Sequence, residues 1–236
     1  MKKIVVLTGA GISAESGIKT FREAGGLWEE HDVMEVASPE GFRQNPELVL
    51  EFYNQRRRHL LGVQPNRAHK SLVDLEAYFE TVIITQNIDD LHERAGSSLV
   101  LHLHGELLKA RSSSDPGLVY PWKKDIRLGD TCALGSQLRP DVVWFGEAVP
   151  MLEAAVRLMV DCDAVLIVGS SMQVYPAASL TAYAPEHADM YYIDPNPGIN
   201  YELSMRQALR VIAKRATTAV PEVVSELIRT HAGNTK

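Results

Sequence analysis

The chain contains 236 residues, 45% of them hydrophobic and 23% charged, which excludes an intrinsically disordered protein and fits one large domain, with or without a small one. A formal net charge of −6 argues against non-specific binding to nucleic acid or to an anionic membrane surface. The two cysteines, Cys132 and Cys162, lack a secretory context, and no apolar run reaches the roughly 18 residues of a membrane span. We therefore expect a cytoplasmic protein without disulfides and with no nucleic acid or membrane as a partner.

Four short apolar runs predict buried parallel strands, at residues 4–7, 81–85, 164–168 and 190–193. Helical patterns lie between and after them, at 46 to about 61 with Asn45 as N-cap, and around 68–77, 151–160 and 221–228. This alternation predicts an α/β fold with a Rossmann-like, doubly wound parallel sheet. Such a sheet binds its ligands beyond the carboxyl ends of the strands, where small or polar residues follow the first three runs.

Two stretches do not fit this alternation and predict a small inserted second module. Residues 31–65 have helical patterns with no strand beside them, and residues 106–138 are polar and rich in turn formers. The Rossmann-like domain would then comprise residues 1–30, 66–105 and 139–236.

A glycine-rich segment directly follows the first strand. Residues 9–14, which begin Gly9-Ala10-Gly11, match the G-x-G-x-x-A fingerprint, in which glycines let a pyrophosphate approach the backbone. A tight turn from strand to helix explains this pattern equally well when it stands alone. The acidic residue that should hold a ribose about 20 positions further on is missing, because residues 21–28 read as a loop. A nucleotide would therefore not be bound in the manner of ordinary dehydrogenases.

Five segments together resemble the sirtuin (Sir2) family. They are residues 9–17 followed by Thr20-Phe21-Arg22, then 85–89 (TQNID), 102–105 (HLHG), 139–147 (RPDVVWFGE) and 169–178 (GSSMQVYPAA). They occur in the family's order and extend over nearly the whole chain. The resemblance implies an NAD⁺-dependent protein-lysine deacylase. In that reaction the acyl oxygen of the lysine attacks the ribose of NAD⁺ as nicotinamide leaves, and the acyl group ends on ADP-ribose.

The resemblance also implies roles for individual residues. His104 would be the general base, because the pKa of histidine suits this task, although a lone histidine is more often structural. Asn87 would hold the nicotinamide ribose and a water, and Asp89 would bind the carboxamide, although an Asp here also fits a helix cap. The implied NAD⁺-binding set is Gly9, Ala10, Gly11, Phe21, Arg22, Trp28, Gln86, Asn87, Ile88, Asp89, Gly169, Ser170, Ser171, Asp194, Pro195, Asn196 and Ala216. Asp194 stands where the family usually has an Asn.

The resemblance implies a groove for acyl-lysine proteins or peptides as partners. Phe145 and Gly146 would line one side and Val174 the other, and the substrate would add between them as an extended strand. Two ordinary core strands fit the same pattern.

One predicted helix carries residues that resemble those of the sirtuin branch that removes succinyl and malonyl groups. Tyr53 and Arg56 lie three residues apart on the predicted helix and therefore share a face. With a small residue at Ala37 to leave room, they would bind the distal carboxylate of a dicarboxylic acyl group, and the enzyme would also deacetylate. A solvated basic helix face is the alternative, since Arg57 and Arg58 follow directly.

Many sirtuins hold a structural zinc ion with two Cys-x-x-Cys pairs. Here Ser112-Ser113-Ser114 stand at the first pair, Thr131 and Leu134 align with the second, and Cys132 lies one place off. We therefore expect no metal. Two further functions remain open from the sequence: an ADP-ribosyltransferase or NAD⁺ hydrolase, and a non-catalytic NAD⁺-sensing module.

Overall fold

The computed structural model describes residues 1–20, 27–28 and 31–233. Its centre is a six-stranded parallel sheet with the strand order β11-β10-β9-β1-β4-β5. The strands are β1 (Lys3–Thr8), β4 (Glu80–Thr85), β5 (Val100–His102), β9 (Ala164–Val168), β10 (Asp189–Ile193) and β11 (Leu209–Ile212). The order runs outward from β1 in both directions, so the predicted doubly wound α/β sheet is confirmed.

Two strands of this sheet, β5 and β11, are not among the four apolar runs predicted as strands, and β10 is therefore not the last strand. Both lie at the edges of the sheet and are largely half-buried or exposed. An edge strand needs no continuous apolar run, which is the signal that identified the four central strands.

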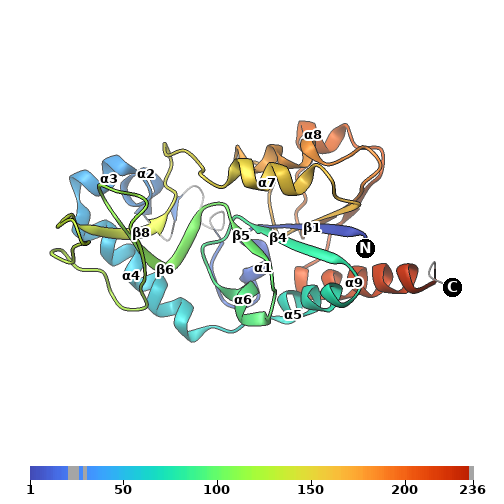
Figure 1. Cartoon of the computed structure of the whole chain (residues 1–236), viewed down its shortest axis with the longest axis horizontal. Coiled ribbons are helices and arrows are strands. Elements are labelled where there is room, and N and C mark those ends of the chain that lie inside the picture. The colour runs from blue at the N-terminus through green and yellow to red at the C-terminus, as the bar shows by residue number, and fades with distance from the viewer. Residues whose placement is uncertain (21–26, 29–30, 234–236) are drawn as a thin grey trace.

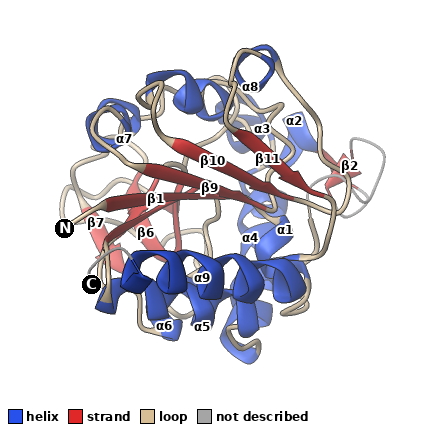
Figure 2. Cartoon of the chain, turned by 90° about the vertical axis from the view of Figure 1, so that its right-hand side faces the viewer, coloured by secondary structure: helices blue, strands red, loops and turns tan. Residues whose placement is uncertain are grey.

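Helices cover both faces of the parallel sheet (Figure 2). On one face lie α5 (Arg67–Val73), the 3₁₀ helix η1 (Asp74–Ala77), α6 (Leu91–Ala95) and α9 (Ala216–Gly233), which begins five residues before the predicted start. On the other lie α7 (Leu152–Met159), the 3₁₀ helix η2 (Ala177–Tyr183) and α8 (Tyr201–Ser204).

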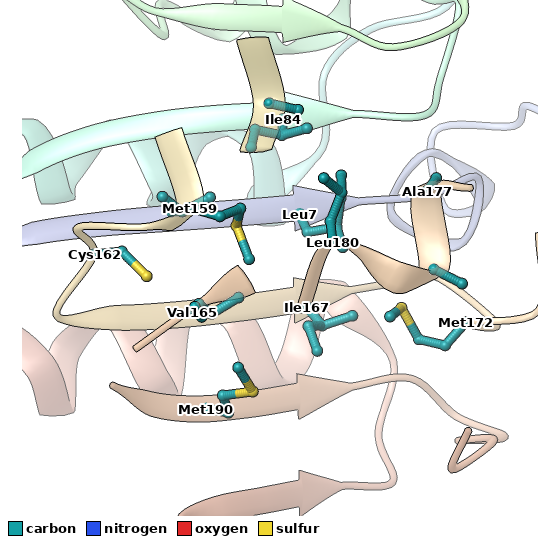
Figure 3. Close-up of a cluster of buried hydrophobic side chains, with 14 of the residues drawn as sticks. Leu7, Ile84, Met159, Cys162, Val165, Ile167, Met172, Ala177, Leu180 and Met190 are labelled. Atoms are coloured by element: carbon teal, nitrogen blue, oxygen red, sulfur yellow. The ribbon is translucent and has the colours of Figure 1, made fainter. Parts of the chain in front are cut away.

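Alternate residues of β1 enter the two cores on either side of the sheet. Ile4 and Val6 pack towards α5 and α9, and Val5 and Leu7 pack towards α7 and η2. Figure 3 shows the second cluster, in which Leu7 lies among side chains of β9, α7 and η2. Burial on both faces explains why the central strands read as unbroken apolar runs.

A second group of elements lies beyond the carboxyl ends of the strands (Figure 1). It contains an antiparallel sheet of the order β7-β6-β8, formed by β6 (Gly105–Ser112), β7 (Val119–Pro121) and β8 (Leu138–Val142). Beside it lie α2 (Val33–Val36), α3 (Pro39–Gln44) and α4 (Pro46–Gly62), and the Asn45 side chain caps α4 as predicted. An antiparallel pair of short strands, β2 (Leu27–Trp28) and β3 (His31–Asp32), precedes them, so the expectation of no strand within residues 31–65 is wrong. The boundaries of an inserted module stay a prediction.

Two side chains of helix α4, Asn54 and Arg57, form hydrogen bonds to the part of the chain that contains the antiparallel sheet. The Asn54 amide accepts from the backbone N–H of Ile126 and donates to its carbonyl, both at 2.9 Å. The Arg57 Nε donates to the Leu107 carbonyl at 3.0 Å.

Among the described helices, none is long and apolar enough to cross a membrane.

Hydroxyl groups and one thiol meet in the antiparallel sheet region. Ser114 donates to Ser136 at 2.7 Å and lies 3.2 Å from the Ser112 hydroxyl, which lowers the pKa of the neighbouring Cys132 thiol. Within residues 1–20, 27–28 and 31–233, no group of three or more His, Cys, Asp or Glu side chains could hold a metal ion. The three serine hydroxyls of this region therefore bond to one another.

We predict that this region is stable without metal. Incubation with a strong chelator should leave the thermal midpoint unchanged, and elemental analysis of folded protein should find no stoichiometric zinc, because neutral hydroxyls are poor zinc ligands. About one zinc per chain, with a midpoint that falls on chelation, would contradict the prediction.

Candidate nucleotide and peptide site

The loops after β1 and β9 touch backbone to backbone. Gly9 donates to the Val168 carbonyl at 3.1 Å and Gly11 to the Gly169 carbonyl at 2.8 Å. A Cβ atom on Gly11 would lie 2.6 Å from the Gly169 Cα, and one on Gly9 would lie 2.8 Å from the Gly169 oxygen. The two glycines of the fingerprint are thus required by this contact. Helix α1 (Gly11–Ala14), which follows, has only four residues.

The loop after β4 bonds to both of these loops. Gln86 donates to the Ser170 hydroxyl at 3.0 Å, and the Asn87 amide donates to the Gly9 carbonyl at 3.2 Å. The Ser13 hydroxyl donates to Asp89 at 2.9 Å. Three segments far apart in the sequence therefore meet at the carboxyl ends of β1, β4 and β9, where the strand order reverses and where such sheets bind ligands.

Asp89 is a buried carboxyl group that accepts two hydrogen bonds. Its Oδ1 accepts from the backbone N–H of Leu91, the first residue of α6, but the N-cap residue of this helix is Asp90 and not Asp89. Burial raises its pKa to about 6, although the bonds from Leu91 and Ser13 act in the other direction. A carboxyl group with this pKa can present either an acceptor or a donor to a carboxamide near neutral pH.

His104 lies between β5 and β6 with its Nδ1 2.9 Å from the Gln86 carbonyl. A carbonyl only accepts, so the Nδ1 carries the proton and the lone pair of a neutral ring is on Nε2. Burial lowers the pKa of His104, and the bond to Gln86 offsets this only in part. His104 is therefore a neutral imidazole at neutral pH, with an Nε2 able to accept a proton.

The remaining predicted nucleotide residues lie at the same end of the sheet or in undescribed segments. Asp194 follows β10 and its Oδ1 accepts from the N–H of Asn196 at 2.8 Å, while the buried Ala216 begins α9 after β11. Phe21 and Arg22 lie outside the described residues, and of Trp28 only the backbone strand is described.

A buried polar network lies under these loops, and sequence reasoning missed it. The Thr8 hydroxyl donates to that of Thr85 at 2.8 Å and contacts His92 Nε2 at 3.1 Å. His69 Nε2 lies 3.4 Å from the Ser13 hydroxyl. Ser13 belongs to the glycine-rich fingerprint and had a signal there, but a histidine inside a helix carries none.

Burial lowers the pKa of both buried histidines of this network, to about 4 for His69 and well below the ordinary value for His92. Their rings meet edge to face, with centroids 4.9 Å apart. Both are therefore neutral at physiological pH, and they support the loops as hydrogen-bonding groups without adding charge.

The segment of residues 143–147 is held by Glu147. This carboxylate accepts from the guanidinium of Arg139 at 2.6 Å, from Arg111 at 3.0 Å and from the Trp144 N–H at 2.8 Å. Burial alone would raise the pKa of Glu147, but these donors hold it below its ordinary value. Arg139 and Glu147 are thus residues that fix this segment, a role that the sequence motif did not reveal.

The predicted peptide and acyl residues approach one another around this segment. The Phe145 N–H donates to the Ala37 carbonyl at 2.9 Å, and Phe145 is 41% exposed, so its ring is accessible. Trp144 donates to the buried Tyr53 hydroxyl at 3.0 Å. Gly146 adopts a φ of +89°, and Val174 is half-buried in the loop after β9.

Comparison with known proteins places this geometry in a family. The model of the Sir2 family matches residues 9–176. The chain belongs to the Sir2 family. It is 57% identical over 228 residues to an NAD-dependent protein deacylase of Helicobacter pylori, covering 97% of this chain and 98% of that one. It is 50% identical over 234 residues to one of Bacteroides thetaiotaomicron, covering 97% and 99%. The crystal structure of a Sir2 homolog–NAD complex superposes with a TM-score of 0.86 at 36% identity, over 98% of this chain and 91% of that one.

We predict that Asp89 makes the stability of this Sir2 protein fall as the pH rises. Its pKa of about 6 in the folded state exceeds the ordinary 3.8, so the folded state binds the proton more tightly than the unfolded chain. The resulting loss of stability begins near pH 4 and is complete above pH 6, and amounts to about 3 kcal/mol.

Asp89→Asn removes this titration. Urea unfolding of wild type and variant at pH 4 and pH 8 should show the variant gaining about 2–3 kcal/mol relative to wild type between the two pH values. A stability difference that is the same at both pH values would contradict the shifted pKa.

Proposed function

We propose that this Sir2 protein is an NAD⁺-dependent protein-lysine deacylase that transfers the acyl group of a modified lysine to ADP-ribose and releases nicotinamide. Relatives that match nearly the whole chain are named NAD-dependent protein deacylases. The observation that carries the proposal is the neutral His104, whose ring is fixed through Nδ1 to the loop that also bears Asn87. Its Nε2 would take the proton from a ribose hydroxyl, as a general base.

The loops at the sheet edge suit NAD⁺ as the co-substrate. The buried Asp89 offers a carboxyl group of raised pKa to a carboxamide, and the Asn87 amide bonds to the same Ser13 hydroxyl that donates to Asp89. The rest of the NAD⁺ molecule would find backbone partners at residues 9–11 and a side-chain partner in the Ser170 hydroxyl. We assign these contacts together with the other nucleotide-binding residues predicted from the sequence, including Phe21, Arg22 and Asp194.

Acylated proteins are the proposed substrates, because an exposed Phe145 beside the positive-φ Gly146 leaves this segment accessible to an extended peptide. An ADP-ribosyltransferase or NAD⁺ hydrolase would use the same pocket, but would release nicotinamide without an acyl-lysine peptide. A non-catalytic NAD⁺-sensing module would have no need of a neutral base at His104. We also propose that the protein acts in the cytoplasm.

Within this function, we assign recognition of succinyl or malonyl groups to Tyr53 and Arg56. The Arg56 guanidinium lies 3.1 Å from the centroid of the Phe52 ring, and its Nη1 donates to the Phe52 carbonyl at 2.6 Å. The indole N–H of Trp144 donates to the phenol oxygen, which orients the Tyr53 hydroxyl. An oriented guanidinium and a phenol can bind a carboxylate together.

The three consecutive arginines of α4 occupy different environments, which argues against a uniform solvated basic face. Arg58 fits that description, since it is exposed and pairs with Asp125 and Glu51. Arg57 is fully buried and bonds to the protein interior, and burial lowers its pKa to about 10. Arg56 is half-buried between these extremes, as a ligand-binding residue should be.

We expect His104→Ala to leave the fold intact and to lower acyl-peptide-dependent nicotinamide release by about 10²–10⁴-fold, because the general base is lost. His187→Ala is the matched control, since His187 is exposed and far along the chain from the site. Both variants should unfold at the wild-type temperature. Near-normal turnover by folded His104→Ala would overturn the assignment, and nicotinamide release that needs no acyl-lysine would favour the hydrolase.

We expect Arg56→Met to lower kcat/KM for a succinyl-lysine peptide by an amount corresponding to a few kcal/mol, while an acetyl-lysine peptide of the same sequence is spared. The reason is that only the succinyl group leaves a carboxylate without its cation. Arg58→Met, the same change at an exposed position, should affect neither peptide. An equal loss on both peptides in Arg56→Met would mean that Arg56 is structural.

A further inference from the structure

Two histidines at the end of β5 hold consecutive carbonyl groups of the loop after β4. The His102 Nδ1 lies 3.0 Å from the Asn87 carbonyl, and the His104 Nδ1 lies 2.9 Å from the Gln86 carbonyl. Since a carbonyl only accepts, both Nδ1 atoms carry protons. The two rings therefore donate to the carbonyls of the two peptide units that precede and follow the Cα of Asn87.

The second nitrogen distinguishes the two histidines. The Nε2 of His102 lies 2.7 Å from the Glu93 carboxylate, and the His102 side chain is only 7% exposed. Burial alone would lower the pKa of His102, but the Glu93 carboxylate raises it above the ordinary value. His102 thus donates from both nitrogens as an imidazolium, whereas His104 is neutral.

We propose that His102 is a positioning residue of this site, which as an imidazolium links the Asn87 carbonyl to Glu93 and so fixes the loop that carries Asn87. The proposal rests on the deacylase function given above. Glu93 lies on α6, which follows the loop, and His102 lies on β5, which pairs with β4, so the link joins these two elements through the loop. Loss of the His102 charge would release the Asn87 carbonyl, which is one of the two carbonyls that hold the loop. Asn87 would then be misplaced relative to the ribose of NAD⁺.

The charged groups around His102 favour the ionised ring. Glu93 on α6 and Glu106 on β6 both raise its pKa. The His102 charge in turn lowers the pKa of Asp89 and that of the buried His92. His92 is itself neutral, so the ring of His102 faces two carboxylates and no ionised histidine of this group.

The sign of the pH dependence follows. The active form of His102 is protonated, so activity is lost as the pH rises through its pKa and gives an alkaline limb in the profile of kcat against pH. His104 must be neutral, so its titration gives the acid limb. Glu93→Gln removes the neighbouring negative charge, lowers the pKa of His102, and should move the alkaline limb to lower pH by about one unit without moving the acid limb.

The experiment measures kcat and KM against pH for wild type, His102→Gln, Glu93→Gln and the control Glu80→Gln, which changes an exposed carboxylate at the opposite end of β4. His102→Gln should lower kcat about tenfold, change KM for the peptide less than about twofold, and lose the alkaline limb. If the variants have a lower kcat at every pH but keep both limbs of the profile in place, the positioning role is overturned. If His102→Gln does not fold, the Glu93→Gln variant still tests the proposal, because its alkaline limb should move to lower pH.

A second measurement needs no turnover. In an NMR titration of isotope-labelled protein, the His102 ring should titrate with a pKa above its ordinary value, and the carbonyl carbon of Asn87 should shift with the same pKa. Glu93→Gln should lower that pKa. A His102 pKa at or below its ordinary value, or an Asn87 carbonyl that does not follow the titration of His102, would overturn the link. Wild-type protein without activity on any acyl peptide would instead refute the proposed function and leave this titration to test the link.

Discussion

The direct contact between the backbones of two loops is the constraint on which the site depends. The loops after β1 and β9 approach so closely that Gly9, Gly11 and Gly169 have no room for side chains. The parallel sheet brings these loops together because β1 and β9 are neighbours where the strand order reverses. The third loop, after β4, bonds to both, and every proposed reacting group is positioned from this junction.

The polar groups of the junction are costly to bury and are arranged to limit that cost. His69 and His92 are buried as neutral rings, and Ser13 donates to the buried carboxyl group of Asp89. A buried polar group without a partner destabilises the fold, so networks of this kind persist where a function requires them. The raised pKa of Asp89 is the remaining cost, and it falls on a residue proposed to bind the carboxamide.

Electrostatics also separates residues that look alike in the sequence. His102 and His104 stand two positions apart, yet one faces a carboxylate and the other faces only a carbonyl among its described partners, so their pKa values move in opposite directions. Arg56, Arg57 and Arg58 are consecutive, yet α4 turns them towards a ring, the interior and the solvent. Residue type sets which chemistry is possible, and the environment selects which group performs it.

The sequence by itself determined the central strands, the long helix α4 with its Asn45 cap, and the family. Buried strands require continuous apolar runs and helix starts require particular side chains, both of which are local signals. It did not reveal the edge strand β11 or the bounds of the edge strand β5, the network of Thr8, His69 and His92, or the pairing of Arg139 with Glu147. These were decided by the tertiary structure, because an edge strand needs only one buried face and because a hydrogen bond between distant segments exists only once the sheet has brought their strand ends together.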